Sequence, residues 1–264
     1  MEIKMITSTR NSQVKYIEQL QSRSKWRRER KEFVAEGHKM VAEAPRDRLI
    51  KVYASDAFVK SNQEYMEKLD FPYETVSDMV FAQMSDTRTP QGILAVIKML
   101  EYGIEDMLGT KRPLLAVLEN IQDPGNLGTI IRTAECAGVT GVVMSADTVD
   151  IYNPKVIRST MGSIYRVPFM YAQNLQNTLK SLQNKGIALN AAHLDGSVEY
   201  TEMNYRAPSA FLIGNEGNGL TKRTAALADT RVRIPMSGQA ESLNAAVAAS
   251  ILFYEAKRQR KDGF

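Results

Sequence analysis

Three segments of this chain combine amide, carboxylate and arginine side chains with glycines, as loops that hold a ligand do. The first, NIQDPGNLGTIIR at residues 120–132, contains Asn126 and Arg132. The second is FLIGNEGNGL at residues 211–220, and the third is RIPMSGQAESLNAAVAAS at residues 233–250. Each joins an apolar strand to a polar loop. We therefore expect the three loops to form one shared site.

The elements around these loops alternate between strand and helix. We expect strands at residues 114–119, 141–145, 187–192, 210–213 and 231–234, and helices at residues 127–138, 154–161, 175–185, 222–228 and 243–259. Apolar strands separated by helices predict a parallel sheet covered on both faces. Open parallel sheets bind ligands beyond the carboxyl ends of their strands, so the loops after Glu119, Ile213 and Ile234 should converge on one crevice.

The first hundred residues predict a smaller α/β unit. An amphipathic helix, a basic turn and a strand at 32–35 are followed by helices at 38–44 and 63–69 and strands at 50–54 and 92–97. Residues 99–113 lose the pattern and end in Pro113, as a linker would. We therefore expect two domains, residues 1–105 and residues 106–264.

Composition excludes several classes of protein. One cysteine, Cys136, and two histidines, His38 and His193, leave no disulfide framework and no zinc cluster. We interpret Cys136 and His193 as packing residues. No segment has the length of a membrane span and no signal peptide is apparent, so we expect a cytoplasmic protein. Residues 1–31 carry nine Lys and Arg against three Glu, which favours an anionic partner.

The loops do not match the standard nucleotide-binding motifs. The pattern G-x-G-x-x-G does not follow the first strand, and GNEGNGLTK lacks the spacing of a phosphate-binding loop. These differences disfavour a dinucleotide-dependent dehydrogenase and an ATPase.

Four ordered blocks strongly resemble the motifs of the SpoU-type, or TrmH-like, RNA ribose 2′-O-methyltransferases of the SPOUT superfamily. They are DPGNLGTIIRTAECAGVTGVV, NPKVIRSTMGSIYRVP, FLIGNEGNGL and IPMSGQAESLNAAVAASILFYEA. Residues 8–45 and TPQGILAVI at residues 89–97 resemble the family's N-terminal RNA-binding domain. The resemblance implies a parallel-sheet α/β domain with a deep trefoil knot that binds S-adenosylmethionine, preceded by a smaller α/β RNA-binding domain. It also implies a homodimer. We expect no metal in the site.

The resemblance also implies roles for individual residues. The expected catalytic residues are Asn126, Arg132, Glu216, Ser242 and Asn244. The expected cofactor-binding residues are Leu212, Ile213, Gly214, Asn215, Glu216, Gly217, Ile234, Pro235, Met236, Ser242, Leu243 and Asn244. The family's arginine at the position of Arg132 is held to activate the 2′-hydroxyl. Because a guanidinium has a pKa above about 12, a phosphate-bound Arg132 that orients the hydroxyl is the easier chemistry.

Each of these residues also has an ordinary structural interpretation. Asn126 and Ser242 both lie where a helix N-cap is expected. Arg132 fits a solvated or ion-paired helix face, and Glu216 fits an ordinary polar turn.

A basic segment near the N-terminus is typical of a surface that holds a phosphate backbone. The expected RNA-binding residues are Arg23, Lys25, Arg27, Arg28, Arg30, Lys155 and Arg158. The alternative for the N-terminal residues is a solvated charged helix, and Arg166 is ambiguous in the same way. Trp26 either stacks on an unpaired base or anchors the domain.

The combined pattern favours an enzyme that transfers the methyl group of S-adenosylmethionine to a ribose 2′-hydroxyl in structured RNA. Ribosomal RNA is the preferred substrate, with transfer RNA as the alternative. A non-catalytic RNA-binding or ribosome-assembly factor would not need the five polar residues together. An enzyme acting on a small molecule would not need the basic segment.

Overall fold

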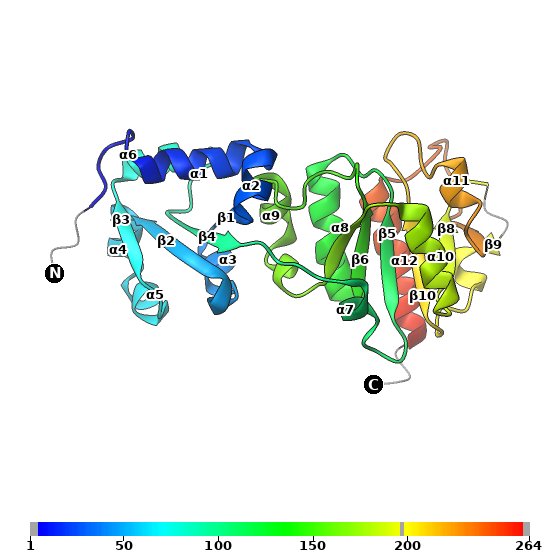
Figure 1. Ribbon diagram of the computed structural model, residues 1–264. Coiled ribbons are helices and arrows are strands. Elements are labelled where there is room, and N and C mark those ends of the chain that lie inside the picture. Colours follow the sequence, from blue (N-terminus) through cyan, green and yellow to red (C-terminus); the bar gives the residue numbers. More distant parts are fainter. Residues whose placement is uncertain (1–4, 196–197, 261–264) are drawn as a thin grey trace. The chain divides into compact units, whose positions relative to one another are not determined.

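The structure, a computed structural model, describes residues 5–195 and 198–260. Contacts between Cα atoms divide the chain into two compact units, which are described separately. The first unit is Met1–Leu100 together with Tyr152–Tyr165, and the second is Glu101–Ile151 together with Arg166–Phe264 (Figure 1). Residues 152–165 therefore belong to the first unit, although the segments before and after them belong to the second. The sequence pattern did not indicate this.

The first unit contains a four-stranded sheet of order β1-β4-β2-β3. Strand β4 is antiparallel to β1 and β2, and β3 is parallel to β2. The strands are β1 (Glu32–Glu36), β2 (Leu49–Ser55), β3 (Tyr73–Val76) and β4 (Ile93–Lys98). The helices are α1 (Ser12–Ser22), α2 (Ser24–Arg30), α3 (His38–Ala42), α4 (Asp56–Ser61), α5 (Gln63–Lys68), α6 (Asp78–Met84) and α9 (Pro154–Thr160).

Two expectations about local structure were wrong. The basic turn expected after the first helix is itself helix α2, and it ends at Lys31, whose φ of 54° is left-handed. The expected linker contains helix α7 (Ile104–Leu108), whose Met107 is fully buried in the core of the second unit. Both helices are shorter than eight residues, so their sequences carry too few turns to show a clear helical period.

The second unit contains a seven-stranded sheet of order β7-β6-β5-β10-β8-β11-β9, in which every pairing is parallel. This confirms the predicted parallel sheet. The strands are β5 (Leu114–Leu118), β6 (Gly141–Ser145), β7 (Phe169–Ala172), β8 (Ala188–Ala192), β9 (Val198–Glu199), β10 (Ser209–Ile213) and β11 (Thr230–Arg233). Its longer helices are α8 (Pro124–Ala137), α10 (Leu175–Asn184) and α12 (Ala245–Arg260), and α11 (Lys222–Ala225) is a single turn.

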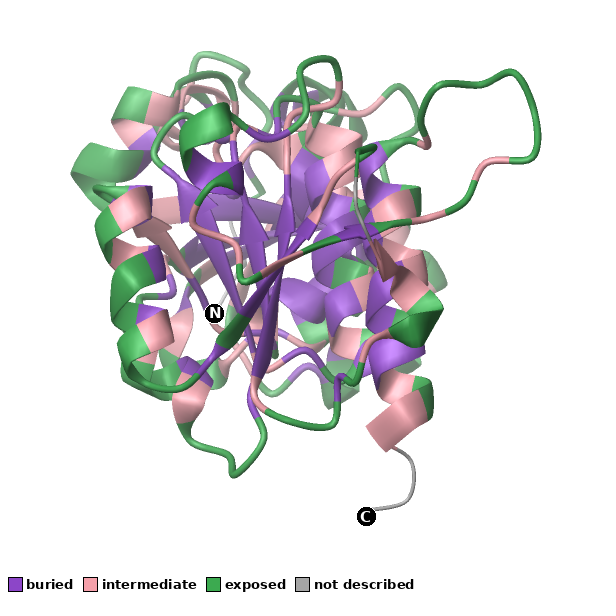
Figure 2. Ribbon diagram, turned by 90° about the vertical axis from the view of Figure 1, so that its right-hand side faces the viewer, coloured by how far each residue is buried: buried purple, intermediate pink, exposed green. Residues whose placement is uncertain are grey.

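The centre of this sheet is shielded from solvent. Strands β5, β6 and β10 are buried at every position, because helices cover both faces of the sheet (Figure 2). Helix α12 packs against α8 and β10. Such a rigid layer fixes where the loops at the strand ends begin. The trefoil knot implied by the family resemblance stays a prediction.

None of the described helices combines the length and the hydropathy that crossing a membrane would require.

Candidate functional site

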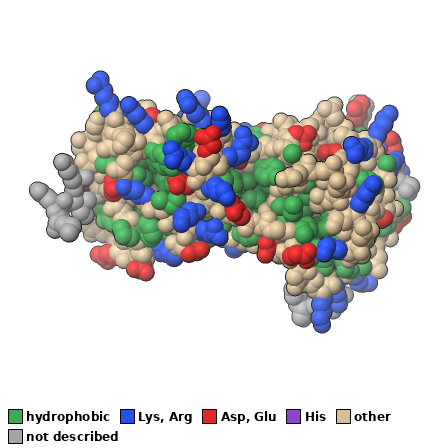
Figure 3. Space-filling view, in the orientation of Figure 1, with side chains coloured by type: hydrophobic (Ala, Val, Ile, Leu, Met, Phe, Trp, Pro, Cys, Tyr) green, Lys and Arg blue, Asp and Glu red, His purple; other side chains and the backbone are tan. Residues whose placement is uncertain are grey.

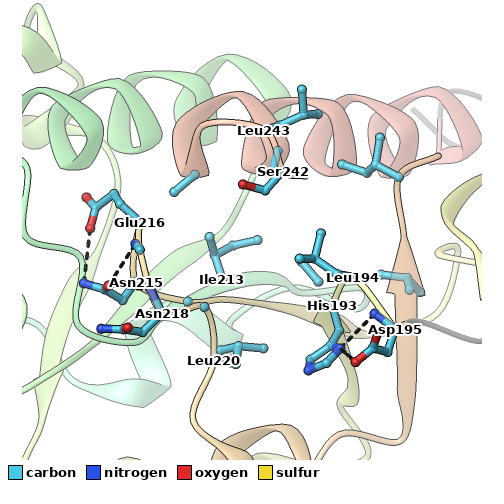
Figure 4. A pocket seen from close by; sticks show the side chains of 18 of the residues that line it. His193, Leu194, Asp195, Ile213, Asn215, Glu216, Asn218, Leu220, Ser242 and Leu243 are labelled. Carbon is cyan, nitrogen blue, oxygen red and sulfur yellow. Dashed lines mark hydrogen bonds and ion pairs between the residues drawn. The ribbon is translucent and has the colours of Figure 1, made fainter. Parts of the chain in front are cut away.

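A cavity of about 360 Å³ lies at the carboxyl ends of the central strands of the second unit. The loops after β8, β10 and β11 and the first turn of α12 enclose it, as expected for an open parallel sheet. In Figure 4, Asn215 and Glu216 stand on one side of this space, His193 and Asp195 on the other, and Ser242 and Leu243 above it. Two of the three segments expected to form the site, residues 211–220 and 233–250, therefore line this cavity.

Most of the expected cofactor-binding residues line this cavity. They are Ile213, Gly214, Asn215, Glu216, Gly217, Ile234, Met236, Ser242 and Leu243. Three others lie elsewhere: the Leu212 side chain belongs to the buried core beneath the sheet, Pro235 is exposed, and Asn244 lies just outside the lining. Because alternate residues of a strand face opposite sides, Leu212 offers the cavity no side chain.

The loop after β10 closes on itself. The backbone N–H of Asn215 donates to the carbonyl of Gly219 at 3.1 Å, and the N–H of Gly219 donates back at 2.9 Å. A Cβ at Gly214 would lie 2.1 Å from the carbonyl carbon of Gly219, so no other residue fits there. The Asn215 carboxamide accepts from the N–H groups of Gly217 and Asn218, both at 3.0 Å. This closed turn presents the Glu216 carboxylate in a fixed place.

Glu216 binds the loop that follows β5. Its Oε2 accepts the backbone N–H of Gln122 at 3.1 Å, and its Oε1 accepts the backbone N–H of Asp123 at 3.0 Å. The Nδ2 of Asn126 also donates to Oε1, at 3.0 Å. Burial raises the pKa of Glu216, but the hydrogen bonds from Asn126, Asp123 and Gln122 outweigh it and leave the pKa below its usual value. Glu216 is thus an ionised brace between two loops.

Asn126 connects Glu216 to the start of the last helix. Its Oδ1 accepts a hydrogen bond from Nδ2 of Asn244 at 2.9 Å, while Oδ1 of Asn244 accepts the N–H of Ala246 at 2.9 Å. Asn244 therefore caps α12 and also holds Asn126. Three of the five expected catalytic residues form one hydrogen-bonded chain, Glu216–Asn126–Asn244.

The helix-cap interpretations of Asn126 and Ser242 are wrong. Helix α8 begins at Pro124, and its cap is Asp123, whose Oδ1 accepts the N–H of Asn126 at 2.8 Å. Helix α12 begins at Ala245, two residues later than expected. Neither residue is therefore a helix cap. The Asn126 side chain donates a hydrogen bond to Glu216 instead, and Ser242 lines the cavity.

Arg132 lies on α8 outside this chain. It is six residues, or about 9 Å along the helix, beyond Asn126. Its side chain is exposed and has no hydrogen bond or ion pair with any described residue. A guanidinium in this setting is open to an incoming anion.

The loop after β8 is part of the site, although its residues were not expected there. Ala192, His193, Leu194 and Asp195 line the cavity, and the His193 side chain is 26% exposed. His193 is thus not a packing residue. Nδ1 of His193 accepts the N–H of Asp195 at 3.1 Å, which leaves Nε2 to carry the proton of the neutral ring. Cys136, the other expected packing residue, is exposed on α8.

The structure describes no acidic or histidine cluster suited to a metal. Within residues 5–195 and 198–260, no three His, Cys, Asp or Glu side chains lie close enough together to hold an ion.

The expected RNA-binding residues all belong to the first unit. Arg23, Lys25, Arg28 and Arg30 are exposed on or beside α2, and Lys and Arg side chains gather over α1 and α2 in Figure 3. Arg27 is the exception: it is 3% exposed, and its Nη1 donates to the carbonyls of Leu20 at 2.7 Å and Gln21 at 2.8 Å. It ties α2 to the end of α1, so it is unavailable to a phosphate.

Helix α9 carries the other two expected RNA-binding residues. Lys155 is exposed, and Arg158 Nη1 donates to Asp86 at 2.9 Å within the first unit. Trp26 packs edge to face on Tyr16, and the Arg30 guanidinium lies 4.7 Å above its ring. Because Trp26 also contacts the hydrophobic core of this unit, it serves as an anchor. Arg166, on the second unit, pairs with Glu135 of α8.

Two family models match the chain. The SpoU rRNA Methylase family matches residues 113–254, which include all three loops of the cavity. The chain belongs to the SpoU rRNA methylase family. An MRM3-like substrate binding domain matches residues 11–95, within the first unit.

Two relatives have sequences similar to most of the chain. It is 35% identical to the 23S rRNA (guanosine(2553)-2′-O)-methyltransferase RlmP of Bacillus subtilis, over 96% of this chain and 98% of the relative. It is 33% identical to the 23S rRNA (guanosine-2′-O-)-methyltransferase RlmB of Shewanella oneidensis, over 71% of this chain and 78% of the relative.

Solved structures share the fold. The SpoU methyltransferase AviRb of Streptomyces viridochromogenes, in complex with the cofactor AdoMet, is 25% identical with a TM-score of 0.87, covering 97% of this chain and 100% of that chain. An AdoMet-bound rRNA methyltransferase of Sinorhizobium meliloti is 32% identical with a TM-score of 0.85, covering 97% of each chain.

The cavity of this chain suits S-adenosylmethionine. Its volume falls in the range of small-molecule sites, roughly 300–1,000 Å³. Apolar side chains of Ile213, Leu220 and Leu243 can receive an adenine, while the carboxylates of Asp195 and Glu216 favour a cation nearby. S-adenosylmethionine is the methyl donor of this enzyme.

Proposed function

We propose that this protein transfers the methyl group of S-adenosylmethionine to a ribose 2′-hydroxyl in large-subunit ribosomal RNA. The hydrogen-bonded chain Glu216–Asn126–Asn244 beside the cavity is the observation that carries this proposal. A protein that only bound RNA would need no such convergence of three loops. The relatives named for 23S ribosomal RNA support this choice of substrate.

Each polar residue has a distinct task in the proposed reaction. S-adenosylmethionine, when bound, supplies a methyl group activated by its positive sulfonium. The chain's own part is to hold the ribose in line and to give the hydroxyl proton a route away, and such orientation recovers roughly 7–11 kcal/mol of a barrier. Asn126, fixed by Glu216 and Asn244, would position the reacting ribose.

Arg132 would bind the phosphate of the target nucleotide. Its unpaired guanidinium matches a phosphate with two parallel hydrogen bonds. Holding that phosphate would turn the 2′-hydroxyl toward the cavity and place a phosphate oxygen near its proton. This role needs no deprotonated arginine.

The two domains divide the work. Residues 1–105 would select the RNA through the exposed cations beside α2, supported by Lys155 and Arg158 of α9, and residues 106–264 would bind the cofactor and carry out the transfer. We expect the enzyme to work in the cytoplasm.

A homodimer is part of the proposal. Val247 and Tyr254, on α12, are 46% and 49% exposed although they are large and apolar. A second copy of the chain would cover them. Light scattering after size-exclusion chromatography should give twice the chain mass of 29.6 kDa. A monomer at micromolar concentration would contradict this part.

The function is tested by mapping ribose methylation in total RNA from cells with and without the gene. One mark in 23S ribosomal RNA should disappear, and the guanosine equivalent to the one modified by the Bacillus subtilis relative is the first to examine. Purified enzyme should restore the mark on RNA from the deletion strain. A mark lost from transfer RNA alone would overturn the proposed substrate, and no lost mark would overturn the activity.

A further inference from the structure

Arg132 has an acidic neighbour on its own helix. Glu135 follows three residues later on α8, and side chains three apart on a helix lie on the same face and readily pair. The Arg132 side chain nevertheless has no partner among the described residues. Glu135 is instead bound by Arg166, whose Nη2 donates to Oε2 at 3.1 Å while its Nε donates to Oε1.

The bidentate pair fixes where the Glu135 carboxylate points. Each of its oxygens accepts one hydrogen bond from the Nε–Nη2 edge of a single guanidinium, the strongest geometry available to such a pair. Arg166 comes from a different segment, just before β7, so the helix alone does not determine this arrangement. The side chains are only 42% and 29% exposed, which limits their freedom to exchange partners.

We propose that Arg166 is a positioning residue that holds Glu135 away from Arg132 and so keeps the Arg132 guanidinium free for the RNA phosphate. This inference rests on the proposed role of Arg132. Without Arg166, the Glu135 carboxylate competes with the phosphate for Arg132 and adds a negative charge close to it. Arg166 itself contacts neither substrate nor cofactor in this account.

The expected effect is modest in size and specific in kind. Two effects weaken RNA binding: an exposed ion pair forms between residues three apart on a helix, and a carboxylate repels a phosphate in a solvated site. Together they should change the affinity for RNA roughly fivefold. The change should appear in kcat/KM for RNA and in RNA affinity. Binding of S-adenosylmethionine should stay the same.

The test compares Arg166→Met, Glu135→Gln and the double variant with the parent enzyme. The substrate is an unmodified in vitro transcript of 23S ribosomal RNA, and RNA affinity is measured by filter binding without cofactor. We expect Arg166→Met to lower kcat/KM and RNA affinity about fivefold. The double variant should recover to within about twofold of the parent, because the amide cannot compete for Arg132. Lys185→Met, which breaks the exposed pair with Glu105 in the same unit, is the matched control and should change neither quantity.

Two results would overturn the inference. If Arg166→Met keeps parental kinetics, Glu135 is not held off Arg132 by this pair. If the double variant is as impaired as Arg166→Met, the arginine acts through packing or folding, which thermal unfolding of both variants would also register. Arg132→Ala distinguishes the two proposals: if that variant is fully active, the role of Arg132 fails, whatever Arg166 does.

Discussion

Asn126 and Glu216 are separated by 90 positions in the sequence, yet Nδ2 of Asn126 donates to Oε1 of Glu216 at 3.0 Å. This bond joins the first turn of α8, which follows the loop after β5, to the loop after β10. Because the same carboxamide accepts from Asn244, the start of α12 is fixed to the same point. Three loops of the catalytic half are thereby held in one arrangement before any ligand binds.

The Glu216 brace predicts a pH dependence of stability. Its folded-state pKa is lowered, so the ionised carboxylate stabilises the fold above the unfolded pKa of about 4.3, and this contribution is lost as the pH falls through the folded-state pKa. Glu216→Gln should cost about 1 kcal/mol at pH 7, after allowance for solvent screening, and almost nothing near pH 2. Urea unfolding across this range measures the difference. A cost that does not change with pH would contradict the ionised brace.

Gly214 should tolerate no side chain. Gly214→Ala would place a methyl group 2.1 Å from the carbonyl carbon of Gly219, and the resulting backbone shift should cost about 3 kcal/mol and abolish cofactor binding. Gly217→Ala is the matched control, since its Cβ would meet only Oδ1 of Asn215, at 3.7 Å. Thermal unfolding and calorimetry with S-adenosylmethionine check both. Equal behaviour of the two variants would disprove the closed turn.

The exposed cations of the first unit should contribute to RNA affinity through phosphate contacts. The triple change Arg23→Gln, Arg28→Gln and Arg30→Gln should weaken RNA binding and flatten the slope of log Kd against log salt by about 2. Changing Lys180, Lys222 and Arg223, which are exposed on the second unit, is the control. An unaltered slope in the triple variant would contradict phosphate contacts by these three arginines.

Arg27 separates a structural role from an RNA-binding one. Arg27→Gln should lower the melting temperature of the protein, because the carbonyls of Leu20 and Gln21 lose their buried donor. The RNA salt slope should not change. A flattened slope with unaltered melting would show that our structural assignment is mistaken.

His193 should contribute to cofactor affinity. It lines the cavity, and its Nε2 proton is available because Nδ1 already accepts from Asp195. His193→Ala should raise the Kd for S-adenosylmethionine about tenfold through loss of one hydrogen bond and of contact area. Calorimetry gives the value directly. An unchanged Kd would place His193 at the rim without a role.

Much of the second unit could be predicted because its strands are continuous apolar runs between helices. Strand β10 and helix α10 lie where the pattern placed them, each within one residue at either end. Helices α4 and α6 escaped prediction because each is two turns or less, and strand β7 because it is four residues long. A segment this short shows at most two turns of its period, so some such elements, for example α5, were predicted and others were not.

The site was predictable only in part, since a sequence pattern does not say which strands are neighbours. The pairing of β8 with β10 brings His193 to the cavity, although the two strands are separated along the chain by β9. Likewise, nothing in a run of basic residues marks Arg27 as the buried one. The helix starts were misplaced because Asp, Asn and Ser are about equally good caps, so the sequence could not distinguish Asp123 from Asn126 or Asn244 from Ser242.

Methyl transfer by the Arg132→Ala variant tests the central claim most directly. Single-turnover rates would be measured with saturating S-adenosylmethionine and unmodified 23S ribosomal RNA, alongside calorimetry for the cofactor. We expect a rate at least about 100-fold below that of the parent, the typical cost of removing one donor that stabilises a transition state, with an unchanged Kd for the cofactor. A parental rate would contradict the account.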